Sequence, residues 1–180
     1  MSLISKANKI KLIITDVDGV LTNGKIYIDN NKNEIKNFHV DDGAGVALAR
    51  LANIPVAFLS GRYSESTSIR AKELKILFCI QGVLDKITAY KEIISHYKLK
   101  KENVCYIGDG LIDIPPIIES GLSITVPNAH SKIKNISDYI TSKSGGEGVL
   151  LEVVELILDK QNRLEKIMDN MIKKIYCYDK

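Results

Sequence analysis

The chain alternates short, continuously apolar runs with longer segments in which apolar residues recur every three or four positions. Apolar runs of five or six residues are typical of strands buried on both faces; they lie at 11–16, 55–60, 76–80, 104–109 and 122–126. The longer segments are typical of amphipathic helices; they lie at 42–53, 64–75, 85–98, 113–121 and 146–160. Strands that alternate with helices predict an α/β fold with a doubly wound parallel sheet and right-handed crossovers.

Two segments depart from this alternation. Residues 24–40 contain two β-rich runs around an Asn- and Lys-rich turn, which predicts a β-hairpin inserted into the fold. A two-stranded hairpin is marginally stable alone, so it is expected to pack on another surface. The tail at 160–180 is charged with spaced apolar residues, and both a helix extension and a loosely ordered segment stay open for it. The length of 180 residues predicts a single domain, 1–180.

Composition narrows the possible partners. Charged residues make up 26% of the chain, and the net charge is only +3 with dispersed basic residues, which argues against a nucleic-acid partner. No apolar stretch approaches 18 residues and the first residues lack the apolar centre of a secretory signal, so we expect a cytoplasmic protein with no membrane partner. Cys79, Cys105 and Cys177 show no metal-like spacing; reduced thiols are expected, the first two buried in strands.

Residues with possible chemistry follow several of the predicted strands. Parallel strands end at one edge of the sheet, where ligands bind, so these side chains are expected to meet there; they are Asp16, Asp18, Ser60, Gly61, Arg62, Lys86, Asp109 and Asp113. Each one alone has a commoner structural explanation, such as a helix cap or a turn. Their joint placement at successive strand ends favours a functional site.

The residue types indicate a site for a cation and a phosphate group. Asp16 and Asp18 are two apart, so in extended chain they point the same way, and their repulsion requires a positive group between them. With Asp109 they offer the oxygen ligands that suit hydrated Mg²⁺. Asp113 follows four residues later, where it can orient the metal's waters or Lys86. Lys86 can neutralise a nucleophile and phosphoryl oxygens together, and the Ser60 hydroxyl and Gly61 N–H can hold phosphate oxygens.

Four segments in order resemble the motifs of the haloacid dehalogenase (HAD) superfamily of phosphatases. They are "DVDGVLTNG" at 16–24, "LSGR" at 59–62, "DK" at 85–86 and "GDGLIDIP" at 108–115, and the resemblance covers nearly the entire chain. Further segments look like the capless sugar-acid phosphatase branch that includes 3-deoxy-D-manno-octulosonate 8-phosphate (KDO 8-phosphate) phosphatases; these are "FHVDDGAG" at 38–45, "QGVLDK" at 81–86, "VPNAH" at 126–130 and "SGGEG" at 144–148. The resemblance implies a Rossmann-like HAD fold with a hairpin and no cap domain.

The resemblance also implies a role for each matching residue. Asp16 would be the nucleophile that forms an aspartyl-phosphate, and Asp18 would protonate the leaving sugar oxygen and then deprotonate water. Ser60 and Lys86 would hold the transferring phosphoryl group. Asp16, the main-chain carbonyl of Asp18, and Asp109 would hold Mg²⁺. The implied substrate is a sugar-acid phosphate of lipopolysaccharide sugar synthesis, and the implied assembly is a homotetramer.

The identity of the sugar acid stays open at this point. The candidate substrate-binding residues are Gly61, Arg62, Arg70, Asp42 and Asn128. Asp41 and Glu147 stand where relatives that cleave KDO 8-phosphate usually carry basic residues, whereas Arg62 matches that branch. An N-acylneuraminate 9-phosphate phosphatase is therefore the alternative.

Two other protein classes use similar residues on a parallel sheet. A phospho-receiver domain accepts phosphate on an Asp after its third strand, where this chain has "QG" at 81–82. A sugar-nucleotide transferase with an Asp-x-Asp metal motif does not explain Ser60 and Lys86. Both classes fit the sequence less well than a phosphatase.

Overall fold

The computed structural model describes residues 2–176, and its centre is a six-stranded sheet in which every neighbouring pair is parallel. The strand order is β5-β4-β1-β6-β7-β8. The strands are β1 (Leu12–Thr15), β4 (Val56–Leu59), β5 (Cys79–Ile80), β6 (Val104–Ile107), β7 (Leu122–Thr125) and β8 (Tyr139–Ile140). Every residue of β1, β4, β6 and β7 is buried, which explains their unbroken apolar runs. The predicted doubly wound α/β fold is confirmed.

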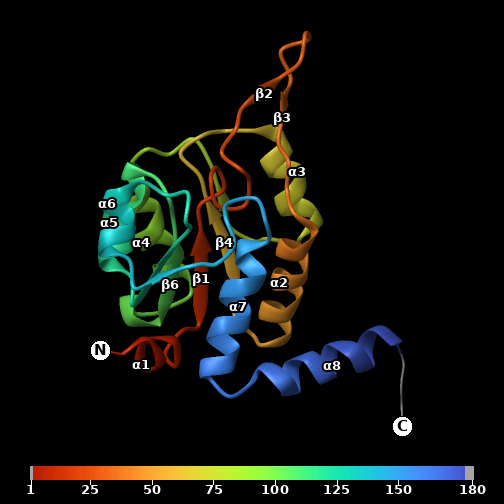
Figure 1. The fold of residues 1–180 in the computed structure, drawn as a ribbon, viewed down its shortest axis with the longest axis vertical. Helices are drawn as coiled ribbons and strands as arrows, with labels where there is room; N and C mark the ends of the chain where they lie inside the picture. Colours follow the sequence, from red (N-terminus) through yellow and green to blue (C-terminus); the bar gives the residue numbers. More distant parts are fainter. Residues whose placement is uncertain (1, 177–180) are drawn as a thin grey trace.

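Helices cover both faces of this sheet, as Figure 1 shows. They are α1 (Leu3–Ala7), α2 (Val40–Leu51), α3 (Glu65–Glu73), α4 (Lys86–His96), α5 (Ile114–Glu119), α6 (Ser131–Ile136), α7 (Val149–Lys160) and α8 (Leu164–Tyr176). The helices α2 and α7 lie together on one face, whereas α4, α5 and α6 lie on the other. Single-turn 3₁₀ helices at Lys101–Asn103 and Leu111–Asp113 precede β6 and α5. No helix in the described part of the chain is both long enough and apolar enough to cross a membrane.

The predicted hairpin forms a separate two-stranded antiparallel sheet of β2 (Tyr27–Ile28) and β3 (Glu34–Ile35). It projects beyond the body of the molecule (Figure 1). Within residues 2–176 this hairpin is the insertion after β1, and no separate cap domain is present. Four large apolar side chains of this region are exposed, at Ile26, Tyr27, Ile28 and Ile35.

The C-terminal tail is helical over its described part. Helix α7 ends at a turn in which Asn162 takes a left-handed backbone conformation (φ 53°), and α8 then packs against α2 and α7. The tail is therefore a second helix and not a continuation of α7. Cys105 is buried as predicted, but Cys79 is only half-buried because β5 is an edge strand, and Cys177 lies outside the described residues.

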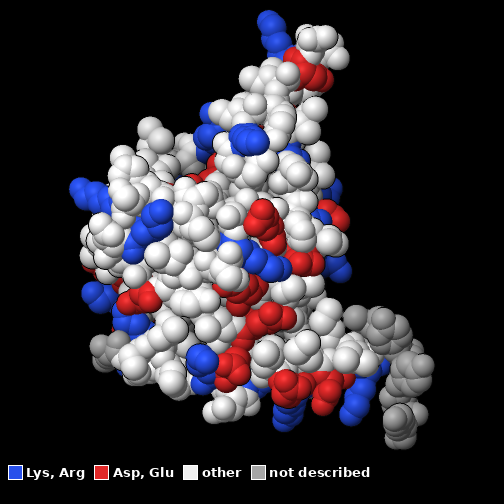
Figure 2. All heavy atoms as spheres, in the orientation of Figure 1, with Lys and Arg blue, Asp and Glu red and all other residues white. Residues whose placement is uncertain are grey.

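Charged side chains are spread over the surface in agreement with the sequence. Figure 2 shows basic side chains scattered among acidic ones on the face that carries α2 and α7. This face carries no single basic stripe.

Candidate active site

The candidate site is a pocket at the carboxyl ends of β1, β4 and β6. The strand order reverses at this point of the sheet, because β4 and β6 flank β1 on opposite sides. The pocket has a volume of about 240 Å³ and is lined by Asp16, Asp18, Ser60, Gly61, Arg62, Leu84, Asp109, Gly110 and Ile112. The structure thus brings together side chains from four segments that the sequence keeps far apart.

A buried lysine lies beneath this pocket. Lys86 is the first residue of α4, and its side chain is 0% exposed. Its Nζ lies 2.8 Å from Asp16 Oδ2 and 2.7 Å from Asp113 Oδ1. Burial by itself lowers the pKa of Lys86, but the two carboxylates outweigh burial and the net shift is upward. The ammonium is therefore held in its charged form against the proposed nucleophile.

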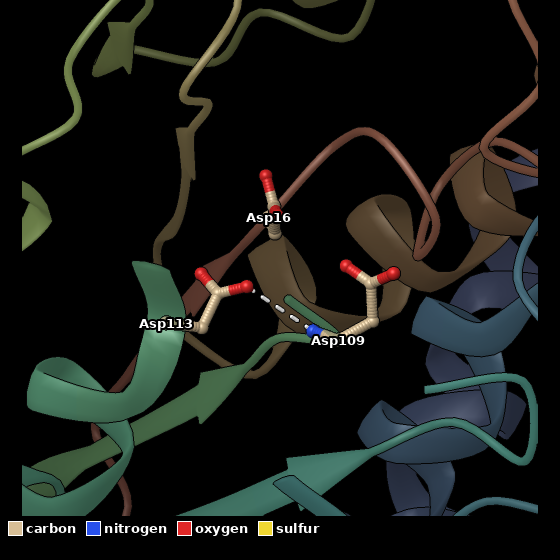
Figure 3. Close-up of side chains that lie close together, drawn as sticks. All are labelled: Asp16, Asp109 and Asp113. Carbon is tan, nitrogen blue, oxygen red and sulfur yellow. Dashed lines mark hydrogen bonds between the residues drawn. The ribbon is translucent and has the colours of Figure 1, made fainter. Parts of the chain in front are cut away.

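Asp113 organises the floor of the site. Its Oδ1 accepts hydrogen bonds from Lys86 Nζ (2.7 Å) and the Tyr106 hydroxyl (2.6 Å), and its Oδ2 accepts from the backbone N–H groups of Asp109 (3.2 Å) and Gly110 (2.9 Å). Figure 3 shows the bond to the Asp109 N–H. Because both of its oxygens are occupied, Asp113 orients Lys86 and the loop after β6. Tyr106 was not predicted, since a tyrosine in a buried strand gives no local sign of a hydrogen-bond partner.

Three carboxylates crowd together at this position. One oxygen each from Asp16, Asp109 and Asp113 lie within 4.8 Å of one another (Figure 3). Burial raises the pKa of Asp16 well above its usual value, and the Asp113 carboxylate adds to this effect. Burial and the same neighbour raise the pKa of Asp109 to about 7. Lys86 alone does not balance this negative charge.

These residues fit a divalent cation. Burial and repulsion both raise the pKa values of Asp16 and Asp109, and a positive ion would offset them by stabilising the charged carboxylates. A donor set made only of oxygen suits Mg²⁺. Asp16 and Asp109 are the carboxylates available for it, because Asp113 is engaged with four donors. Gly19 makes room beside Asp109: a Cβ there would lie 2.1 Å from Asp109 Oδ2. The Asp18 side chain is not part of the cluster, and its main-chain carbonyl stays a predicted ligand.

Asp18 is held by a residue that the sequence did not single out. Lys36 Nζ lies 2.6 Å from Asp18 Oδ1, and Ser60 Oγ lies 3.3 Å from Asp18 Oδ2. Beside them, Glu34 Oε2 lies 2.7 Å from an Arg62 guanidinium nitrogen. Glu34 and Lys36 both come from the hairpin, whose residues were predicted only as a structural insertion.

The predicted substrate-binding residues divide into two groups. Gly61 and Arg62 line the pocket. Asp42 does not: it is buried, and its Oδ1 accepts a hydrogen bond of 3.0 Å from the backbone N–H of Leu150 in the first turn of α7. Asp42 therefore joins α2 to α7 and does not line this pocket, and its predicted contact with a substrate stays a prediction.

Arg70 and Asn128 also lie outside the pocket lining. Arg70 of α3 donates to the carbonyl of His39 just before α2 (3.2 Å) and pairs with Glu73 one turn further along α3 (2.8 Å). Asn128 donates to the carbonyl of Gly19 (3.2 Å) and accepts from the N–H of Gly145 (2.8 Å). Asn128 thus ties the loop after β1 to the loop before α7, and its contact with a substrate stays a prediction.

The two unusual acidic residues lie outside the pocket as well. Asp41 pairs with Lys143 at 3.1 Å, and Glu147 accepts a hydrogen bond from the backbone N–H of Ser144 at 3.2 Å. Neither of them lines the pocket within this subunit.

A larger hollow of about 350 Å³ lies elsewhere, between the end of α2 and the starts of β4 and β5. Its lining contains no carboxylate and none of the predicted site residues. Of these two hollows, the smaller one at the strand ends is the candidate active site, because it carries the carboxylates that the chemistry needs.

The comparisons with known proteins agree with this fold. The family model for haloacid dehalogenase-like hydrolases matches residues 56–153. The chain belongs to this family of hydrolases.

Within the family the chain is similar to KDO 8-phosphate phosphatases. It is 40% identical to KdsC of Escherichia coli K12, over 91% of this chain and 87% of that protein. A crystal structure of the Yersinia pestis phosphatase matches with a TM-score of 0.88 and 40% identity, over 91% of this chain and 88% of that one. The Moraxella catarrhalis phosphatase, solved with magnesium, phosphate and KDO, matches with a TM-score of 0.90 and 39% identity, over 93% and 97% of the two chains.

Proposed function

We propose that this protein is a Mg²⁺-dependent phosphatase that hydrolyses KDO 8-phosphate to KDO and inorganic phosphate. The observation that carries the proposal is the buried Lys86 held between Asp16 and Asp113, directly beneath a pocket lined by Asp18, Ser60 and Asp109. The similarity to KDO 8-phosphate phosphatases over 91% of the chain supports the choice of substrate.

Asp16 is the proposed nucleophile. Its carboxylate attacks phosphorus, the bond from phosphorus to the sugar oxygen breaks, and an aspartyl-phosphate forms on Asp16. Lys86 lies 2.8 Å from Asp16 Oδ2, where its charge can stabilise both the nucleophile and the transferring phosphoryl oxygens. Mg²⁺, when bound by Asp16, Asp109 and the Asp18 carbonyl, supplies the positive charge that offsets the crowded carboxylates and the phosphate.

Asp18 is the proposed acid and base. It gives a proton to the departing sugar oxygen and later takes one from the water that hydrolyses the aspartyl-phosphate. The Ser60 hydroxyl and the Gly61 N–H, both in the pocket lining, hold phosphoryl oxygens while these steps occur. Arg62 lies at the same pocket and is the proposed partner of the substrate's carboxylate.

The proposed setting is the cytoplasm and the proposed assembly is a homotetramer. Four exposed apolar side chains on and beside the hairpin support an interface between subunits, because an exposed apolar group of this kind is typical of a contact surface. They are Ile26, Tyr27, Ile28 and Ile35. Light scattering coupled to size exclusion tests the tetramer; a monomer at micromolar concentration would contradict it.

Phosphate release from a panel of esters, with Mg²⁺ present, tests the function. The panel is KDO 8-phosphate, N-acetylneuraminate 9-phosphate, arabinose 5-phosphate and p-nitrophenyl phosphate. We expect the highest kcat/KM for KDO 8-phosphate. A preference for the nine-carbon ester would instead show that the acidic residues at 41 and 147 accompany a change of substrate. No turnover of any of the four esters would contradict the proposed chemistry.

A further inference from the structure

The strand that leaves the hairpin shows a regular alternation of burial. Glu34, Lys36 and Phe38 are half-buried, whereas Ile35 and Asn37 between them are exposed. Residues two apart in an extended chain share one face, so the first three turn toward the body of the molecule. The hairpin therefore sends an acid and a lysine toward the active site.

The Lys36 side chain is enclosed although it comes from an exposed hairpin. It is 3% exposed, and its Nζ lies 2.6 Å from Asp18 Oδ1 and 3.5 Å from Glu34 Oε1. A lysine side chain is rarely buried unless its charge is paired, and here Asp18 is the near partner. The contact joins residues 18 positions apart in the chain.

Other bonds hold Lys36 in place. Glu34 pairs with Arg62 at 2.7 Å, so the acid that follows the hairpin turn is fixed to the loop after β4. The Ser66 hydroxyl donates to the Glu34 carbonyl at 3.0 Å, which fixes the backbone of β3 to α3. Lys36 is thus presented by a strand that is bonded to the site at two further points.

We infer that Lys36 is a positioning residue for Asp18. Its ammonium holds Oδ1, which leaves Oδ2, on the Ser60 side, to exchange the proton with the leaving oxygen and with water. When Asp18 gives up its proton it gains a negative charge, and the adjacent ammonium compensates that charge. The hairpin then acts in the acid–base step as well as in any subunit contact. This inference rests on the acid–base role proposed for Asp18.

Leaving groups of different acidity test the inference. A p-nitrophenolate departs without a proton, whereas phenol and a sugar alcohol need one from Asp18. We therefore measure kcat/KM, which reports the steps up to departure of the leaving group, for p-nitrophenyl phosphate, phenyl phosphate and KDO 8-phosphate. For Lys36→Met we expect the loss on phenyl phosphate and KDO 8-phosphate to exceed the loss on p-nitrophenyl phosphate by about 10- to 100-fold. Each ratio is taken within one preparation, so partial unfolding of the variant cancels.

Three further variants complete the test. Lys25→Met removes an exposed lysine near the same hairpin and is the charge control. Asp18→Asn removes the acid itself, so its losses of kcat/KM on the three esters give the pattern with which Lys36→Met is compared. Lys36→Arg keeps the positive charge and should restore part of the phenyl phosphate activity. Equal losses on all three esters would mean a merely structural lysine, and a loss confined to KDO 8-phosphate would mean a contact with the substrate carboxylate. Either result overturns the inference, as does an unchanged Lys36→Met enzyme. Failure of the wild type to cleave KDO 8-phosphate would instead refute the proposed substrate, while the two aryl esters would still test Lys36.

Discussion

Replacing Asp113 by asparagine tests how the floor of the site is built. The carboxylate accepts four hydrogen bonds, two at each oxygen, and an amide keeps only one accepting oxygen. The amide oxygen best faces the N–H groups of Asp109 and Gly110. Its NH₂ then faces the Tyr106 hydroxyl, which can turn round and accept. Of the four donors, only Lys86 then loses its bond to residue 113, and its remaining partner is Asp16.

The expected loss of stability follows from the one hydrogen bond that Lys86 loses. A hydrogen bond to a charged group contributes about 1.5–3 kcal/mol, and relief of the repulsion between Asp113 and the other two carboxylates offsets part of it. We expect the free energy of unfolding of Asp113→Asn to fall by about 1–3 kcal/mol. Asp113→Ala leaves all four donors without this acceptor and should lose at least ~2 kcal/mol more. Because Lys86 is less well held, kcat of the asparagine variant should fall about 10- to 100-fold.

Urea unfolding, followed by circular dichroism in EDTA, measures the stability without any contribution from bound metal. Phosphate release in saturating Mg²⁺ measures kcat. The control is Asp159→Asn, which removes an exposed carboxylate paired with Lys160 and should change stability by less than about 0.5 kcal/mol. Two results would refute the proposed organisation by Asp113. One is an Asp113→Asn protein that matches the wild type in both assays, and the other is one whose unfolding free energy and kcat are no higher than those of the alanine variant.

Four further changes have expected outcomes. Asp16→Asn should reduce phosphate release to background while circular dichroism shows an intact fold, and EDTA should remove wild-type activity that Mg²⁺ restores; an active variant or a metal-stripped active enzyme would contradict these roles. The pKa of Asp42 is raised from 3.8 to about 6, mainly by burial, so the folded state holds this proton more tightly than the unfolded state, and stability is lost as the pH rises from about 4 to about 6. Asparagine does not ionise, and the unfolding free energy of Asp42→Asn relative to wild type should therefore rise by roughly 2 kcal/mol between pH 4 and pH 8 in urea titrations, most of it below pH 6; a pH-independent difference would contradict the burial. A Cβ at Gly145 would lie 1.9 Å from the Gly19 carbonyl oxygen, so Gly145→Ala should destabilise by about 1–3 kcal/mol in thermal unfolding, unlike Gly110→Ala, whose Cβ would make an ordinary 3.6 Å contact.

Strong local patterns predicted most of the fold. The five apolar runs correspond to β1, β4, β5, β6 and β7. Four of these strands are fully buried, which favours apolar residues throughout, whereas β5 is a half-buried edge strand. The two-residue strand β8 and the short helices α1 and α6 were not predicted. Segments of two to six residues are too short to show a period, and their hydrogen bonds come from neighbours that only the folded chain supplies.

The sequence by itself determined the chemistry at the strand ends. Asp16, Asp18, Ser60, Lys86 and Asp109 meet at one edge because right-handed parallel crossovers leave no other place for them. Membership of a motif did not specify which groups Asp42 contacts. Asp42 lies in a matching motif, yet it is buried between α2 and α7 and bonds the first turn of α7.

Only the tertiary structure decided what each charge faces. A period of two places Glu34 and Lys36 on one side of a strand, but it does not say that this side meets Asp18 and Arg62. The Tyr106 hydroxyl likewise finds Asp113 only when the loop after β6 folds back over the strand. Local patterns specify which way a side chain points along its own element, whereas its partner depends on long-range packing, and that packing sets the electrostatics of the site.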